Sequence, residues 1–61
     1  MTFKDAEKMI RADGWSYSYA SGSHYHYRHA TKSGKVTIPN HGNKELHPKV
    51  VTSIKKQAGL V

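Results

Sequence analysis

The chain has 61 residues, of which 36% are hydrophobic and 23% charged, and it contains no cysteine. Such a chain is one small domain over residues 1–61, without disulfides, thiolate metal ligands or cysteine nucleophiles. Ten Lys and Arg against four Asp and Glu give a net charge of +6, and the whole excess follows Asp13. We therefore expect that part to attract polyanions. Because no apolar run is long, we also expect a cytoplasmic protein with no membrane partner.

The first predicted element is a helix that starts after Thr2 and ends at Gly14. Thr2 and Asp5 form a variant of the capping box, in which each side chain bonds to the other residue's backbone N–H. Apolar residues then recur at the spacing of one helix face, which comprises Phe3, Ala6, Met9 and Ile10. Gly14 closes the helix, as glycine commonly does.

The second predicted element is a strand over residues 15–20, in which aromatic residues alternate with small ones. We expect Trp15, Tyr17 and Tyr19 on one buried face, before a turn at residues 21–22. Such rings can also stack on nucleobases, but the chain has few other large apolar groups. We therefore expect Trp15, Tyr17 and Tyr27 to pack in the core, together with Phe3, Met9 and Ile54.

Two further strands are predicted, from about residue 23 to 29 and over 36–38, with a turn at 32–34 between them. Pro39 ends the last strand. Side chains alternate along a strand, so the tyrosines of the middle strand face the core and His24, His26 and Arg28 face away. His29 lies on the tyrosine side, where we expect it to be half buried.

The last predicted element is a helix with Pro48 in its first turn and Gly59 and Leu60 at its end. Its apolar stripe is Val50, Val51, Ile54 and Ala58. The order helix, three antiparallel strands, helix predicts an α+β fold with both helices on one sheet face and the other face open. The same order is found in double-stranded-RNA-binding-like domains.

The outward face of the middle strand is the candidate site. His24 and His26 lie about 6–7 Å apart along the strand, with Arg28 beyond them. Imidazoles exchange protons near neutral pH, and a guanidinium can hold a phosphate, so the trio suits RNA cleavage by acid–base catalysis without a metal. Spacing does not choose between His24 and His26 as the catalytic group, although His24 lies beside the Gly22 turn.

Other interpretations of these residues stay open. Histidines on a solvent face are often only polar surface, and a zinc site of His24 and His26 with His41 or His47 would lack both cysteine and a placed carboxylate. The lysines at 32, 35, 55 and 56 each occupy positions common for surface lysine. A non-catalytic RNA-binding module would use the same basic surface, and a third possibility is a small interaction protein.

Four segments resemble the HicA toxins of type II toxin–antitoxin modules. They are Asp13-Gly14-Trp15, the run from Gly22-Ser23-His24 through Tyr27-Arg28-His29, residues 36–39 with 41–46, and the ending 53–60. The resemblance implies a double-stranded-RNA-binding-like fold and mRNA interferase activity, with His24 after Gly-Ser as the catalytic residue. The chain departs from the family pattern at Ala30, His47 and Lys49, which lie in turns and at the start of the second helix.

The resemblance also implies partners. A HicB-type antitoxin would bind the toxin and block its active surface, mRNA would be the substrate, and any oligomer would form only through the antitoxin. No cofactor is expected. RNA contacts by His26, Arg28 and Lys35 are inferred from strand alternation and charge, and the resemblance does not supply them.

Overall fold

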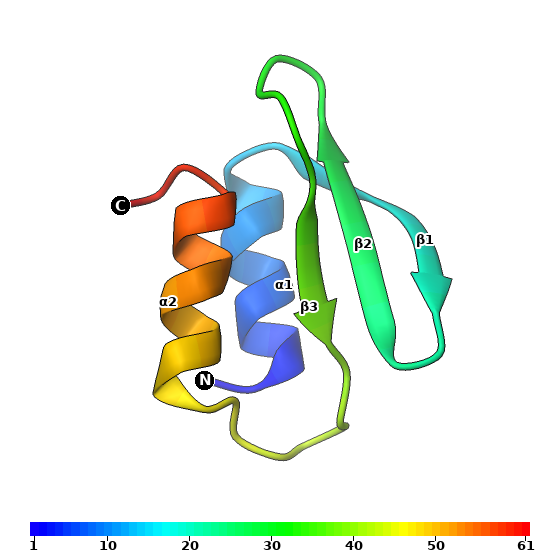
Figure 1. The fold of residues 1–61 in the computed structure, drawn as a ribbon, viewed down its shortest axis with the longest axis vertical. Helices are drawn as coiled ribbons and strands as arrows, with labels where there is room; N and C mark the ends of the chain where they lie inside the picture. Colours follow the sequence, from blue (N-terminus) through cyan, green and yellow to red (C-terminus); the bar gives the residue numbers. More distant parts are fainter.

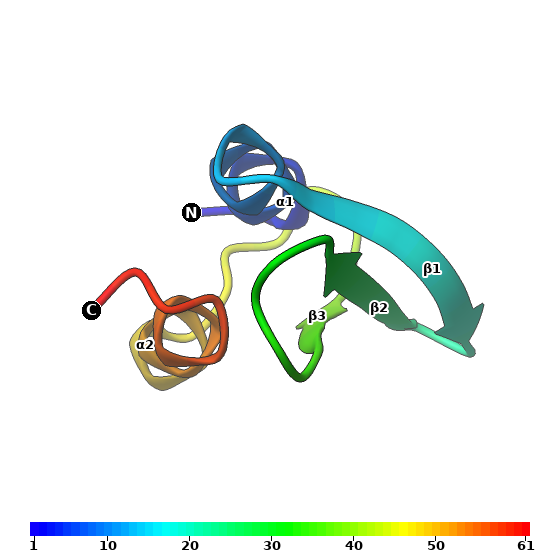
Figure 2. The same cartoon turned by 90° about the horizontal axis from the view of Figure 1, so that it is seen from above.

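Two helices and three strands make up the chain, and the computed structural model describes all 61 residues. In chain order they are α1 (Phe3–Ala12), β1 (Trp15–Ser21), β2 (His24–His29), β3 (Val36–Pro39) and α2 (Pro48–Gln57) (Figure 1). The strands form one antiparallel sheet in the order β1-β2-β3, and Figure 2 shows both helices on the same side of it. The predicted α+β fold is confirmed. Neither helix has the length and hydrophobicity needed to cross a membrane.

Both helices begin and end where the sequence predicts. At the start of α1 the backbone N–H of Thr2 donates to the Asp5 carboxylate at 2.9 Å, and Thr2 Oγ1 accepts from the Asp5 N–H at 3.4 Å. These bonds with Thr2 lower the pKa of the Asp5 carboxyl. At the end of α2, Gly59 has φ 72°, and the Leu60 N–H donates to the Lys55 carbonyl at 2.8 Å. This is a Schellman cap, which satisfies carbonyls that the helix leaves free.

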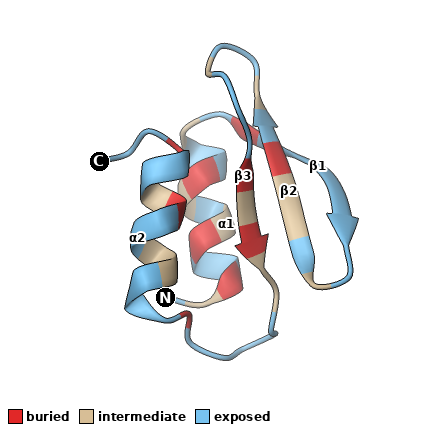
Figure 3. Cartoon of the chain, viewed as in Figure 1, coloured by how far each residue is buried: buried red, intermediate tan, exposed pale blue.

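The core lies between the helices and the inner face of the sheet (Figure 3). Ten residues are buried: Phe3, Ala6, Ile10, Trp15, Tyr27, Val36, Ile38, Leu46, Ile54 and Ala58. Tyr27 is fully buried, and its hydroxyl donates to Glu7 of α1 at 2.5 Å. Burial and this bond raise the pKa of Tyr27. The expected alternation of β2 is confirmed, because Tyr27 faces the core while His24 and Arg28 are exposed.

The expectation that Tyr17 and Tyr19 share a buried face with Trp15 is wrong. Tyr17 pairs with Tyr27 but Tyr19 pairs with His26, so Ser18 is an extra residue in β1 and forms a bulge. The bulge turns Tyr19 to the outer face. Tyr17 stays on the inner face and contacts the rings of Tyr25 and Tyr27, but it is 48% exposed because the helices do not extend over this part of the edge strand.

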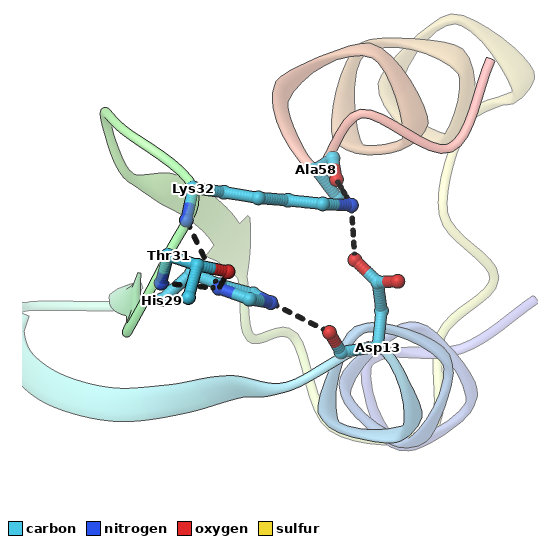
Figure 4. Close-up of polar contacts among 5 residues, drawn as sticks. All are labelled: Asp13, His29, Thr31, Lys32 and Ala58. Carbon is cyan, nitrogen blue, oxygen red and sulfur yellow. Dashed lines mark hydrogen bonds and ion pairs between the residues drawn. The ribbon is translucent and has the colours of Figure 1, made fainter.

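A polar cluster of Asp13, His29, Thr31, Lys32 and Ala58 joins α1, the β2–β3 loop and α2 (Figure 4). His29 Nδ1 accepts backbone N–H groups of Thr31 at 3.0 Å and Lys32 at 3.1 Å, so the ring proton is on Nε2, which donates to the Asp13 carbonyl at 2.7 Å. Lys32 donates to the Asp13 carboxylate at 2.5 Å and to the Ala58 carbonyl at 3.0 Å. Lys32 is therefore a structural residue, which the sequence did not indicate.

Candidate active site

The outer face of the sheet, opposite the helices, carries the residues singled out in the sequence. In the strand register His24 lies between Ser21 of β1 and Pro39 of β3. His26 lies between Tyr19 and Thr37. Opposed residues in antiparallel strands point to the same face, so these six side chains share one surface. We call this surface, with Arg28 and Lys35, the outer face.

His26 is held at the centre of the outer face. Its ring stacks on the Tyr19 ring, with centroids 4.4 Å apart and planes inclined by 24°, and its Nδ1 lies 2.9 Å from Thr37 Oγ1. Partial burial lowers the pKa of His26, and the nearby charges of Lys35 and His24 lower it further. The neutral imidazole is therefore favoured at His26.

His24 has a different setting, although it shares the strand. It is exposed at the start of β2, directly after the two-residue connection Gly22-Ser23, and its side chain makes no hydrogen bond. Gly22 supplies the positive φ of 57° that this tight connection requires. The Asn40 N–H donates to the Ser23 carbonyl at 2.7 Å, which ties the hairpin to the end of β3. His24 thus projects into solvent from an anchored turn.

Two cations lie next to the histidines. Arg28 Nη1 donates weakly to the Gly34 carbonyl at 3.4 Å, and Lys35 Nζ lies 3.5 Å from Tyr19 Oη and 6.0 Å from the centre of that ring. Arg28 and Lys35 are both exposed, and neither pairs with a carboxylate. Both remain available to bind an anion.

All four carboxylates of the chain have partners away from the outer face. Asp5 caps α1, Glu7 accepts from Tyr27 and lies 3.7 Å from Arg11, Asp13 pairs with Lys32, and Glu45 pairs with the amino group of Met1. The positive charge of the outer face is therefore not compensated locally. A surface of this kind attracts phosphate groups.

Comparison with known families identifies the family of the chain. The family model described as the HicA toxin of bacterial toxin–antitoxin matches residues 3–60. The chain belongs to the HicA toxin family. The resemblance seen in the four sequence segments is thereby confirmed. A search of curated proteins finds no match.

The three histidines of this HicA chain that lie away from the outer face are His29, His41 and His47. His29 is a half-buried structural residue, as expected, and His47 caps α2 by accepting the Lys49 N–H at Nδ1, at 3.0 Å. His41 is exposed in the loop before α2. No three histidine or acidic side chains gather in a metal-binding group, so the zinc site of His24 and His26 with His41 or His47 is not formed.

Sequence reasoning missed Tyr19 and Thr37, the two residues of the HicA outer face whose side chains contact His26. A bulge reverses the side on which a residue points, and no residue of β1 marks Ser18 as its position. Thr37 could have been found, because the strand pairing of residues 24–29 with 36–39 places it beside His26. The one pocket lies elsewhere, lined by Arg11, Trp15, Ser16 and Tyr17, so the outer face is an open surface.

Proposed function

We propose that this HicA protein is an mRNA endoribonuclease of the cytoplasm that cleaves by acid–base catalysis with His24, needs no metal ion or cofactor, and is inhibited by a HicB-type antitoxin. The observation that carries the proposal is His24 itself. It is an exposed imidazole on an anchored hairpin, on a sheet face where the charged groups are cations. Membership of a toxin family supports the assignment.

The proposed cleavage uses the 2′-hydroxyl of the RNA itself as the nucleophile. The 2′-oxygen attacks the adjacent phosphorus, the bond from phosphorus to the 5′-oxygen breaks, and a 2′,3′-cyclic phosphate and a free 5′-hydroxyl result. One proton leaves the 2′-hydroxyl and one is added to the 5′-oxygen. An imidazole can carry out either transfer, and a positioned acid or base contributes roughly 10²–10⁴ in rate.

The cations of the outer face would bind the substrate. Arg28 and Lys35 are exposed and have no carboxylate partner, so they can contact phosphates and offset the charge that develops on the cleaved one. With His26 they form the proposed RNA-binding residues. If about five cations of the chain meet phosphates, the logarithm of affinity for single-stranded RNA falls with the logarithm of salt at a slope of roughly −3 to −4.

An antitoxin that covers the outer face would silence the toxin. The net charge of +6 favours an acidic partner surface, which competes directly with RNA. A partner that binds only the folded form also stabilises a small domain. We expect HicB to be such a partner.

The test compares His24→Ala with His41→Ala, since both histidines are exposed and only the first is on the outer face. We expect His24→Ala to lower the rate of RNA cleavage by roughly 10²–10⁴ and to lose toxicity, while unfolding and antitoxin binding stay as in the wild type. His41→Ala retains activity, and a chelator leaves cleavage unchanged. Cleavage by His24→Ala at the wild-type rate refutes the assignment. RNA binding without any cleavage by the wild type would identify a non-catalytic RNA-binding module.

A further inference from the structure

The outer face holds two imidazoles, and the reaction requires two proton transfers. His24 and His26 are two residues apart on one face of β2, which separates them by about 6–7 Å along the strand. The protons leave and arrive on opposite sides of one phosphorus atom. Two imidazoles with this separation can each form a hydrogen bond to one of its bridging oxygens.

His26 is restrained in a way that His24 is not. Tyr19 covers one side of its ring, and Thr37 Oγ1 lies 2.9 Å from Nδ1. Thr37 is itself fixed from α2, because its backbone N–H donates to the Gln57 amide oxygen at 3.0 Å. The imidazole of His26 is therefore oriented by three secondary-structure elements.

The contact with Thr37 occupies Nδ1 of His26 and leaves Nε2 as the nitrogen that is free to react. A hydroxyl can accept a hydrogen bond from Nδ1–H whether the ring is neutral or protonated, so the contact persists when Nε2 takes up a proton. Nε2 makes no hydrogen bond in the structure, and it is not among the buried atoms that lack a partner. Nε2 is therefore accessible as a base.

The groups around His26 also favour its neutral form. Partial burial lowers the pKa of His26, and Lys35 beside β3 and His24 on β2 lower it further. The other groups that face it, Tyr19 from β1 and Arg28 from β2, include no carboxylate. A neutral imidazole is the form required to accept a proton.

We propose that His26 is a second catalytic residue, the base that takes the 2′-hydroxyl proton at Nε2, and that His24 is the acid. This rests on the proposed ribonuclease function. As His26 accepts the proton, the 2′-oxygen forms its bond to phosphorus. The bond from phosphorus to the 5′-oxygen breaks with its electron pair on oxygen, and His24 protonates that oxygen. Proton exchange with water then restores both rings. Thr37 and Tyr19 are positioning residues.

A substrate with sulfur in place of the bridging 5′-oxygen separates the two roles, because a thiolate leaves without protonation. On ordinary RNA both His24→Ala and His26→Ala lose roughly 10²–10⁴ in rate. On the sulfur substrate His24→Ala recovers most of its activity and His26→Ala does not. Recovery of His26→Ala, or its cleavage of ordinary RNA at the wild-type rate, overturns the proposal. If the wild type cleaves neither substrate, the ribonuclease function itself fails.

The pH profile supplies a readout that a structural role would not alter. The wild-type rate falls as acid protonates His26, and this decline should be absent from the residual activity of His26→Ala.

Thr37→Val should lower kcat about tenfold with little change in KM. Thr37→Ser should restore kcat, because serine keeps the hydroxyl that contacts Nδ1 of His26. Circular dichroism and antitoxin binding check that each variant is folded. A wild-type pH profile in folded His26→Ala contradicts the base assignment.

Discussion

Gly14 should be the glycine least tolerant of substitution, because two separate constraints meet there. Its φ of 103° lies where residues with a side chain are strained. A Cβ at this position would lie 2.7 Å from His29 Nε2, the atom that donates to the Asp13 carbonyl. Gly14→Ala therefore both strains the backbone and displaces the ring that joins α1 to the β2–β3 loop.

The magnitude can be estimated from these two effects. A strained φ of this kind costs about 1–3 kcal/mol, and loss of the His29 hydrogen bond costs about 1 kcal/mol more. A domain of this size has a free energy of unfolding of roughly 3–9 kcal/mol. A loss of about 3 kcal/mol lowers the unfolding midpoint by about 12–24 °C. Gly14→Ala should therefore be unfolded in part at growth temperature.

Thermal unfolding followed by circular dichroism measures the effect, and Gly34→Ala is the matched control. Gly34 also has a positive φ, of 80°, but no atom lies within 4 Å of its added Cβ. We expect the control to lose about 1–2 kcal/mol. In a His29→Ala background the cost of Gly14→Ala should fall to that of the control. Equal costs for Gly14→Ala in both backgrounds would refute the role of His29.

Two other predictions concern residues whose roles the structure revised. Lys32→Met should lower the unfolding midpoint by about 2–8 °C at neutral pH. The hydrogen bond from Lys32 lowers the pKa of Asp13 below its usual 3.8. The stability that this bond adds is therefore present above pH 3.8 and is lost as the pH falls through the lowered pKa. The difference in midpoint between Lys32→Met and the wild type should shrink over that acidic range. Tyr17→Ser should change the midpoint by less than about 4 °C, whereas Tyr27→Phe, which removes the bond to Glu7, should lower it by about 4–8 °C. A larger loss from Tyr17→Ser than from Tyr27→Phe would contradict the observed burial.

The features that the sequence predicted correctly depend on neighbours along the chain. The capping box at Thr2, the cap at Gly59 and the alternation of β2 each involve residues within a few positions of one another. Short-range hydrogen bonds and side-chain periodicity determine them, so the sequence displays them directly. The placement of His24 on the exposed side of the sheet follows from the same alternation.

The features that the sequence did not reveal depend on contacts between distant residues. Lys32 resembles any lysine in a turn until α1 and α2 bring Asp13 and the Ala58 carbonyl to it. The bulge at Ser18 matters more for function, because it turns Tyr19 from the inner face to the His26 ring. Without this extra residue Tyr19 would stay on the side of Tyr17, and His26 would lose the aromatic cover that keeps it partly buried. The acid–base pair that we propose therefore depends on a bulge at Ser18, and a serine at this position does not reveal from the sequence that a bulge forms there.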